Sequence, residues 1–185
     1  MGNRGRLHDD TGAMTAKTHN HRNWIICQLH FRGRKRTINA PGQYTELFAL
    51  DEATFMAAGH RICAECQRER YELFKSAWRV AHDIAPGARL LASEIDAQLH
   101  AARIDAEGRQ ITHRAFLDTL PDGVFITLDK APKRPLLLWE GALRQWTHGG
   151  YGPPKPAPAG AVVRVLTPAP LVRTIAAGFT PTAPV

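Results

Sequence analysis

The sequence predicts an α+β fold in which a small metal-binding knuckle, a β-hairpin and helices precede a small antiparallel sheet. Three observations support this class. A Cys-x-x-Cys pair stands beside a helix-period apolar pattern in the first half, and short apolar runs separated by turn residues fill the second half. The 185 residues, 44% hydrophobic and 22% charged, suffice for a buried core. We expect two regions, residues 1–82 and 83–185, packed as one unit.

The first part of the chain is expected to hold short strands. Residues 1–21 are polar and have no period, which is typical of an irregular arm. The apolar run 24–31, the turn at Arg32-Gly33 and residues 34–38 predict a β-hairpin, because glycine supplies the turn. Residues 45–50 predict another short strand.

Helices are predicted to follow. Asp51 is a typical N-cap for a helix through residue 58, and Gly59 suits the left-handed position that ends it. Residues 67–82 predict the clearest helix. Its apolar face recurs at three- and four-residue steps: Tyr71, Phe74, Ala77 and Trp78. Ser93 is expected to cap a further helix to about residue 104, with Asp96 as its capping-box partner.

The second half has the pattern of a sheet. Apolar runs predict strands at 123–128, 135–140, 142–146 and 161–166. The proline-rich segment 153–158 is expected to be a surface connection, because proline has no N–H to donate to a ladder. Thr167 and Pro168 open a last short helix that ends near Gly178. The tail 180–185 is expected to be loose.

The chain is basic, with 24 Lys and Arg against 17 Asp and Glu and a net charge of +7. The densest basic run lies at the predicted hairpin turn: Arg32, Arg34, Lys35 and Arg36. Such a cluster can contact phosphates, because displaced counterions drive sequence-independent binding to nucleic acid. These four residues are therefore the predicted nucleic-acid contacts. The alternative is a turn whose charges are only solvated.

Membrane and export signals are absent from the pattern. No run is apolar and long enough for a membrane span, and the first ten residues lack the apolar core of a signal peptide. Three cysteines, two of them as Cys-x-x-Cys, fit a reducing compartment better than a disulfide scaffold. We expect a cytoplasmic protein without a membrane partner.

Cys63-Ala-Glu-Cys66 predicts a metal site. Two thiolates with two residues between them can hold one tetrahedral ion, because this spacing brings both sulfurs to the same side of a turn. Cys27 is the remaining cysteine, and on an apolar strand it is either a third ligand or a buried free thiol. Zinc is the expected metal. Four protein ligands would make the site structural, whereas three would leave a position open for water or substrate.

Residues 47–66 resemble the second half of the Ada-type metal-binding domain. In that family a strand leads into a helix with an alanine at the position of Ala53, and then into Gly-aromatic-Arg-Pro-Cys-x-x-Cys, where this chain has Gly59-His60-Arg61-Ile62 before its cysteine pair. The family binds zinc through four cysteines, and its best-known members repair methylphosphotriesters in DNA. The resemblance therefore implies zinc and a link to DNA repair or its regulation. The whole chain is also similar to bacterial proteins that open with Gly-Asn-Arg-Gly. This second resemblance does not indicate a particular activity.

The resemblance also implies a ligand set. The family's first cysteine pair is reduced here to Cys27, so a histidine has to complete the shell, and His30 is the predicted fourth ligand. Positions three apart on a regular strand face opposite sides, so this pairing requires a bend. Three other histidines compete with His30: His8, His21 and His60. Without four thiolates, a structural ion is expected rather than a methyl acceptor at Cys27.

A second group of residues could carry catalysis. His100 and Arg103 share a helix face, and the segment after the turn at 105–108 could return His113 and Arg114 toward them. A general base with arginines around a phosphate would use such residues, and the alternative is a charged helix followed by a polar loop. The favoured function is a zinc-stabilised nucleic-acid-binding protein. The alternative function is a metal-dependent or histidine-based hydrolase or nuclease.

Overall fold

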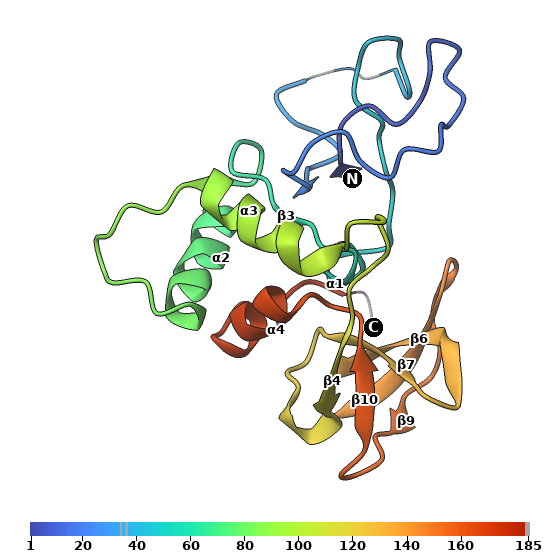
Figure 1. The fold of residues 1–185 in the computed structure, drawn as a ribbon, viewed down its shortest axis with the longest axis vertical. Coiled ribbons are helices and arrows are strands. Elements are labelled where there is room, and N and C mark those ends of the chain that lie inside the picture. The colour runs from blue at the N-terminus through green and yellow to red at the C-terminus, as the bar shows by residue number, and fades with distance from the viewer. Residues whose placement is uncertain (34, 36, 184–185) are drawn as a thin grey trace.

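Helices lie between an irregular N-terminal segment and an antiparallel sheet in the computed structural model, which describes residues 1–33, 35 and 37–183 (Figure 1). The predicted α+β class is confirmed, since helices and two separate sheets are both present. One hydrophobic cluster includes Ile26 from the first region and Leu171 from the second. The two predicted regions therefore share a core.

The four α-helices are α1 (Glu52–Ala57), α2 (Arg68–Ala81), α3 (Ala92–Arg103) and α4 (Ala169–Ala176), and a short 3-10 helix spans Leu117–Thr119. Asp51 caps α1 as predicted, accepting from Thr54 N at 2.7 Å. The predicted apolar face of α2 is buried in full. Within the described part of the chain, no helix has the length and apolar character needed to cross a membrane.

The start of α3 differs from the prediction. The helix begins at Ala92, and Glu94 rather than Asp96 accepts from a preceding backbone N–H, that of Leu91, at 2.6 Å. Ser93 lies exposed inside the first turn. Asp96 is instead buried, and both of its carboxylate oxygens accept from Arg61. This tertiary contact takes the place of the capping role that the sequence pattern predicted for Asp96.

The predicted hairpin is wrong as far as the structure describes it, since residues 31–33, 35 and 37–38 form no strand. The apolar run contributes only β2 (Ile25–Ile26), which lies between β1 (Gly2–Asn3) and β3 (Arg61–Ile62) in a three-stranded sheet. The β1–β2 pair is antiparallel and the β2–β3 pair is parallel. Both edges of β2 are thus taken by segments distant in sequence, and no neighbouring strand is needed. The strand predicted at 45–50 is reduced to a single bridge between Gly2 and Leu47.

Apart from β1, residues 1–21 are irregular as predicted, but they are not a loose arm. Met1, Leu7 and His8 are all buried. The His8 ring lies 2.6 Å from Thr45 Oγ1 through Nδ1 and 3.1 Å from the Ala40 carbonyl oxygen through Nε2. Side-chain hydrogen bonds therefore hold this segment in place where it has no regular β-sheet hydrogen bonds. Such contacts leave no periodic pattern in the sequence.

The larger sheet confirms the predicted antiparallel architecture. Its order is β4 (His113–Phe116), β10 (Val162–Val165), β5 (Phe125–Leu128), β6 (Ala131–Trp139), β7 (Ala142–Thr147) and β8 (Gly150–Tyr151), with β9 (Lys155–Pro156) also paired to β7. All of these pairs are antiparallel. Segment 153–158 thus supplies a short strand as well as a connection, and it lies at an edge, where proline is tolerated.

The C-terminal tail is packed as far as the structure describes it. Thr182 accepts a hydrogen bond from Ala53 N at 3.3 Å and donates one to Glu52 Oε2 at 3.0 Å. Arg70 joins the same contact by pairing with Glu52 at 2.6 Å. The expectation of a loose tail is therefore wrong up to residue 183, because the tail satisfies the N-terminal end of α1.

Candidate metal centre

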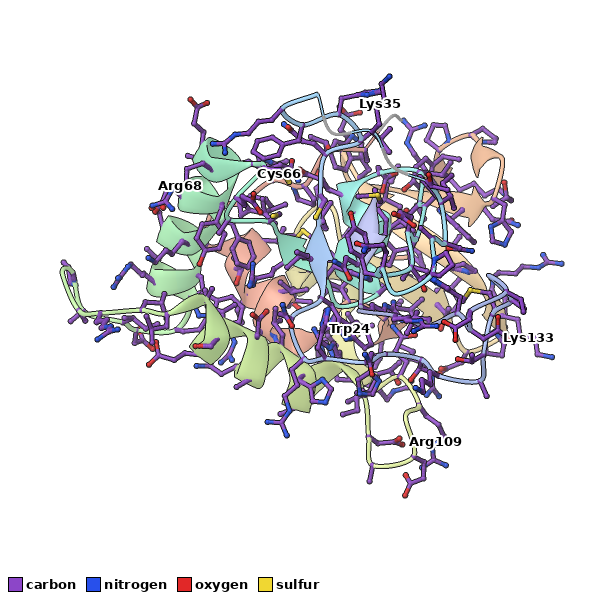
Figure 2. All side chains as sticks on the ribbon, turned by 90° about the horizontal axis from the view of Figure 1, so that it is seen from above. Trp24, Lys35, Cys66, Arg68, Arg109 and Lys133 are labelled. Carbon is purple, nitrogen blue, oxygen red and sulfur yellow. The ribbon has the colours of Figure 1, made fainter. Side chains whose placement is uncertain are left out.

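Three cysteine sulfurs meet where the small sheet joins α2. Cys27 directly follows β2 and Cys63 directly follows β3, so the register Ile26 to Ile62 brings the two thiols side by side. Cys66 completes the group from the turn that leads into α2, near Arg68 in Figure 2. The three sulfur atoms all lie within 4.8 Å of one another. The structure therefore assembles the three cysteines that the sequence singled out.

Hydrogen bonds polarise these thiols. Gln28 N donates to Cys66 Sγ at 3.3 Å. The Cys27 thiol donates to Cys63, which lowers the pKa of Cys63 to about 5, and the backbone N–H groups of Cys66 and Glu65 act in the same direction. The same hydrogen bond raises the pKa of Cys27. Cys63 is thus the thiol that is most readily deprotonated, and a thiolate is the form that binds metal.

The donor set fits a soft or borderline metal ion. Thiolates about 2.3 Å from one tetrahedral zinc lie about 3.8 Å apart, a spacing that the sulfur group already approaches. All three cysteines are free rather than joined in a disulfide. Zinc would find here three thiolates held by two strands and a helix, with one coordination position left over. The group could therefore hold a metal ion.

The predicted ligand set and the structure differ at the fourth ligand. Among the described residues, no histidine or carboxylate belongs to the sulfur group, and His30 is exposed beyond it. His8 is bound to Thr45 and Ala40, as described above. His60 has its two nitrogens engaged by Phe55 and Arg4, and His21 also lies outside the group. A water or an added ligand would have to complete the tetrahedron.

The candidate catalytic residues do not form one group. His100 and Arg103 meet on α3, where Arg103 Nη2 donates to His100 Nδ1 at 3.1 Å. His113 lies on β4 opposite Val165, and Arg114 forms an exposed pair with Asp129 at 2.7 Å. No hydrogen bond in the described part of the chain joins the second pair to the first. The segment after the turn continues into the sheet instead of folding back.

A cluster around Trp24 is not predicted by any pattern in the sequence. The guanidinium carbons of Arg4 and Arg103 lie 3.9 and 3.8 Å from the centroid of its ring. His60 packs against the same indole at 5.5 Å between centroids. Trp24 resembles any apolar strand residue in sequence, and Arg4 stands in a stretch without a period. Near this place, only the Gly59-His60-Arg61 run after α1 drew notice in the sequence.

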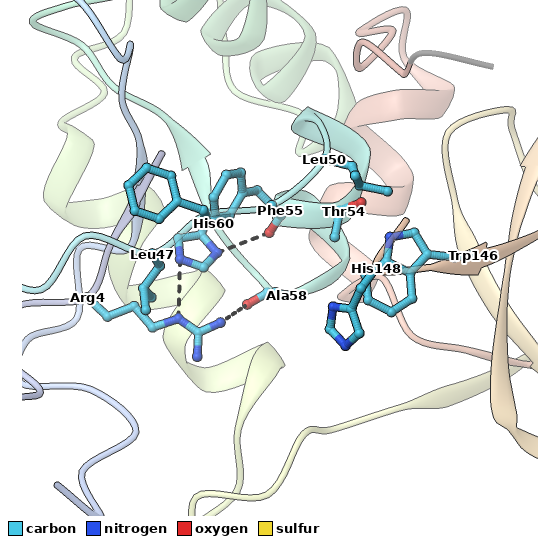
Figure 3. Close-up of a pocket in the computed structure, with 11 residues that line it drawn as sticks. Arg4, Leu47, Leu50, Thr54, Phe55, Ala58, His60, Trp146 and His148 are labelled. Carbon is cyan, nitrogen blue, oxygen red and sulfur yellow. Dashed lines mark hydrogen bonds between the residues drawn. The ribbon is translucent and has the colours of Figure 1, made fainter. Parts of the chain in front are cut away.

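His60 carries a testable pH dependence. Its Nδ1 lies 3.1 Å from the Phe55 carbonyl and donates to it, so neutral Nε2 can accept from Arg4 Nε at 3.2 Å (Figure 3). Burial, Arg4, Arg103 and the terminal amine place the pKa of His60 well below its usual value. The unfolded chain therefore binds more protons below about pH 6.5, and we expect the free energy of unfolding to fall there by up to about 1.4 kcal/mol per pH unit.

Urea unfolding between pH 7.5 and 5.5 measures this effect. His60→Asn, which keeps a donor for the Phe55 carbonyl, should show a smaller fall than the wild type. His30→Asn, at an exposed position, is the matched control and should retain the wild-type slope. An unchanged slope in His60→Asn would show that this imidazole does not titrate differently in the folded and unfolded states.

No protein-family model matches the chain, and no curated protein or solved structure does either. The class of the protein therefore follows from its own fold and side chains. It is an α+β protein with a three-cysteine group that could hold a metal ion, and with a second centre in which buried Arg103 and half-buried Arg4 pack against Trp24.

Proposed function

We propose that the chain is a zinc-stabilised nucleic-acid-binding protein. The observation that carries the proposal is the three-cysteine group, which lies at the start of the most basic segment of the chain. Cys27 is separated from Arg32 by only four residues. A zinc ion bound by the three sulfurs would hold Cys27, just before that segment, close to the start of α2. The resemblance of residues 47–66 to the Ada-type domain is what connects the proposal to DNA repair.

Exposed cations support the nucleic-acid part. Arg32 and Lys35 are both exposed, and Lys35 points away from the body of the protein in Figure 2. Arg34 and Arg36, the other two predicted contacts, lie outside the described residues. The net charge of +7 adds a long-range attraction to phosphates. Four cations within five residues would displace counterions from a nucleic-acid backbone without reading its sequence.

Metal analysis and a salt titration on one preparation test the two parts. We expect one zinc per chain, and duplex DNA affinity that falls steeply with salt. Replacing Arg32, Arg34, Lys35 and Arg36 together by alanine should reduce the slope of log K against log salt by up to about 4, since each phosphate contact contributes about 0.9. Zinc content should stay the same, because none of the four is a ligand.

Lys130→Ala/Lys133→Ala is the matched control, since both lysines are exposed on the larger sheet. This variant should keep most of the wild-type slope. Metal-free, folded wild-type protein would contradict the zinc part of the proposal. DNA affinity that is absent, or equal in the four-residue variant and the wild type, would contradict the nucleic-acid part.

A further inference from the structure

Arg4 and Arg103 form a second charged centre, apart from the three cysteines. Arg103 is 1% exposed and Trp24, against which both guanidinium groups pack, is 2% exposed. The chain makes room for this arrangement at Gly59: a Cβ atom there would lie 2.6 Å from Arg103 Cδ, and φ is +83°. The two arginines, called the arginine pair below, are thus built into the fold rather than spread over its surface.

The arginine pair has no counter-charge of its own. Among the residues that the structure describes, no carboxylate forms an ion pair with either side chain. Asp96 acts on Arg103 electrostatically, but both of its oxygens accept from Arg61. Burial lowers the pKa of Arg4 to about 10 and that of Arg103 to about 9. Arg103 is buried and Arg4 half-buried, and a buried charge is ordinarily paired, so this centre lacks an anion.

Within the part of the chain that the structure describes, donors on both guanidinium groups have no hydrogen-bond partner. Arg4 donates to His60 and to the Ala58 carbonyl, which engages two of its five N–H groups (Figure 3). Arg103 donates to the carbonyls of Gly59 and Arg22 and to His100, while its Nε is buried without a partner in the described chain. Each unsatisfied buried donor is costly, which favours a ligand that accepts several hydrogen bonds.

A cavity lies against both arginines. Its volume is about 160 Å³, several times what one water needs, and Arg4, Trp24 and Arg103 line it. Thr18 and Gln110 also line it and are exposed, so the cavity reaches the surface. Arg4 lines a second cavity of about 480 Å³ as well, whose apolar wall includes Phe48 and Trp146. One arginine therefore connects a small cationic cavity to a larger apolar one.

The surrounding histidines indicate the sign of the charge that a ligand would carry. His19 and His100 pack against each other, with 5.1 Å between ring centroids, and both pack against Trp24. Burial lowers the pKa of each, and the charge of Arg103 lowers both further. A metal cation would be repelled at this place. An anion would be attracted by the same field.

We propose that the small cavity binds the phosphoryl group of inorganic phosphate or of a phosphate monoester. A planar carboxylate would be satisfied by one arginine through two parallel bonds, whereas a tetrahedral dianion can accept from both members of the arginine pair. The organic part of a monoester would enter the larger cavity past Arg4, between His60 and Trp146 in Figure 3. This site depends neither on zinc nor on DNA binding by the basic segment.

Calorimetric titration of the full chain with inorganic phosphate tests the site. We expect saturable binding, and a melting temperature raised by about 5–10 °C at phosphate a hundredfold above Kd, relative to chloride at equal ionic strength. Arg4→Gln and Arg103→Gln should each weaken phosphate about 10- to 100-fold. Arg114→Gln, at an exposed arginine paired with Asp129, should bind like the wild type.

The outcomes separate the sources of the phosphoryl group. Tighter binding of a 5′-mononucleotide than of phosphate would support the larger cavity as the place of the organic group. Equal binding would overturn that part. Oligonucleotides with and without a 5′-phosphate that compete equally with inorganic phosphate would overturn the assignment of the site to a phosphate monoester rather than to backbone phosphodiesters. If the glutamine variants do not fold, the wild type still decides: the same melting temperature in phosphate and chloride overturns the site.

Discussion

Asp96→Ala is expected to destabilise the protein by about 3–5 kcal/mol, because it leaves the Arg61 guanidinium buried without its carboxylate. Arg61 Nε and Nη2 donate to the two Asp96 oxygens at 2.8 and 2.7 Å. The side chains of the pair are only 6% and 7% exposed. The pair joins β3 to α3 close to the cysteine turn, so its loss should reach the metal centre as well.

Asp129→Ala is the matched control for that substitution. Arg114 binds Asp129 through two bonds of 3.0 and 2.7 Å, a geometry like that of the buried pair, but these side chains are 51% and 56% exposed. Exposed pairs contribute about 0–1 kcal/mol. Urea unfolding of both variants measures the difference. Equal losses would contradict the view that burial, rather than geometry, sets the strength of the Arg61–Asp96 interaction.

The helices and four strands of the larger sheet were predictable because their signals are local, whereas β4 and β9 were not predicted. The period of α2, the cap at Asp51 and the apolar runs of β5, β6, β7 and β10 are all short-range patterns. The small sheet was not predictable, since Ile25 pairs with Asn3 and Arg61, which are remote in sequence. A strand of two residues has no period to detect.

The candidate site shows the same division. The spacing of Cys63 and Cys66 indicated a metal site, and Cys27 joins them in the structure. His30 was assigned by its nearness in sequence to Cys27, yet the chain turns outward after β2 and leaves it exposed. The cluster of Arg4, Trp24 and Arg103 depends on three separate segments. Charge counts treat such arginines as surface cations, because burial is a property of the fold.

Removing the proposed zinc is expected to have its largest effect on the small sheet. At zinc a thousandfold above its Kd, binding to the folded state adds about 4 kcal/mol to stability, and a chelator should remove that amount. Cys63→Ser should do the same, since Cys63 is the thiol that its neighbours make most acidic. The melting temperature with and without chelator, and its recovery on adding zinc, measures the effect.

Hydrogen exchange locates the same effect within the fold. The sulfurs join β2, β3 and the start of α2, whereas the larger sheet has no cysteine. Metal removal should therefore expose the amides of residues 24–29 and 61–67 first, while β5, β6 and β7 remain protected. His30→Ala is the control: because His30 is exposed and lies outside the sulfur group, this variant should keep the proposed zinc and the protection. Loss of the metal from His30→Ala would instead identify His30 as the fourth ligand and require the chain after Cys27 to fold back over the metal. Equal loss of protection in both sheets would show that the metal centre stabilises the whole core rather than the small sheet alone.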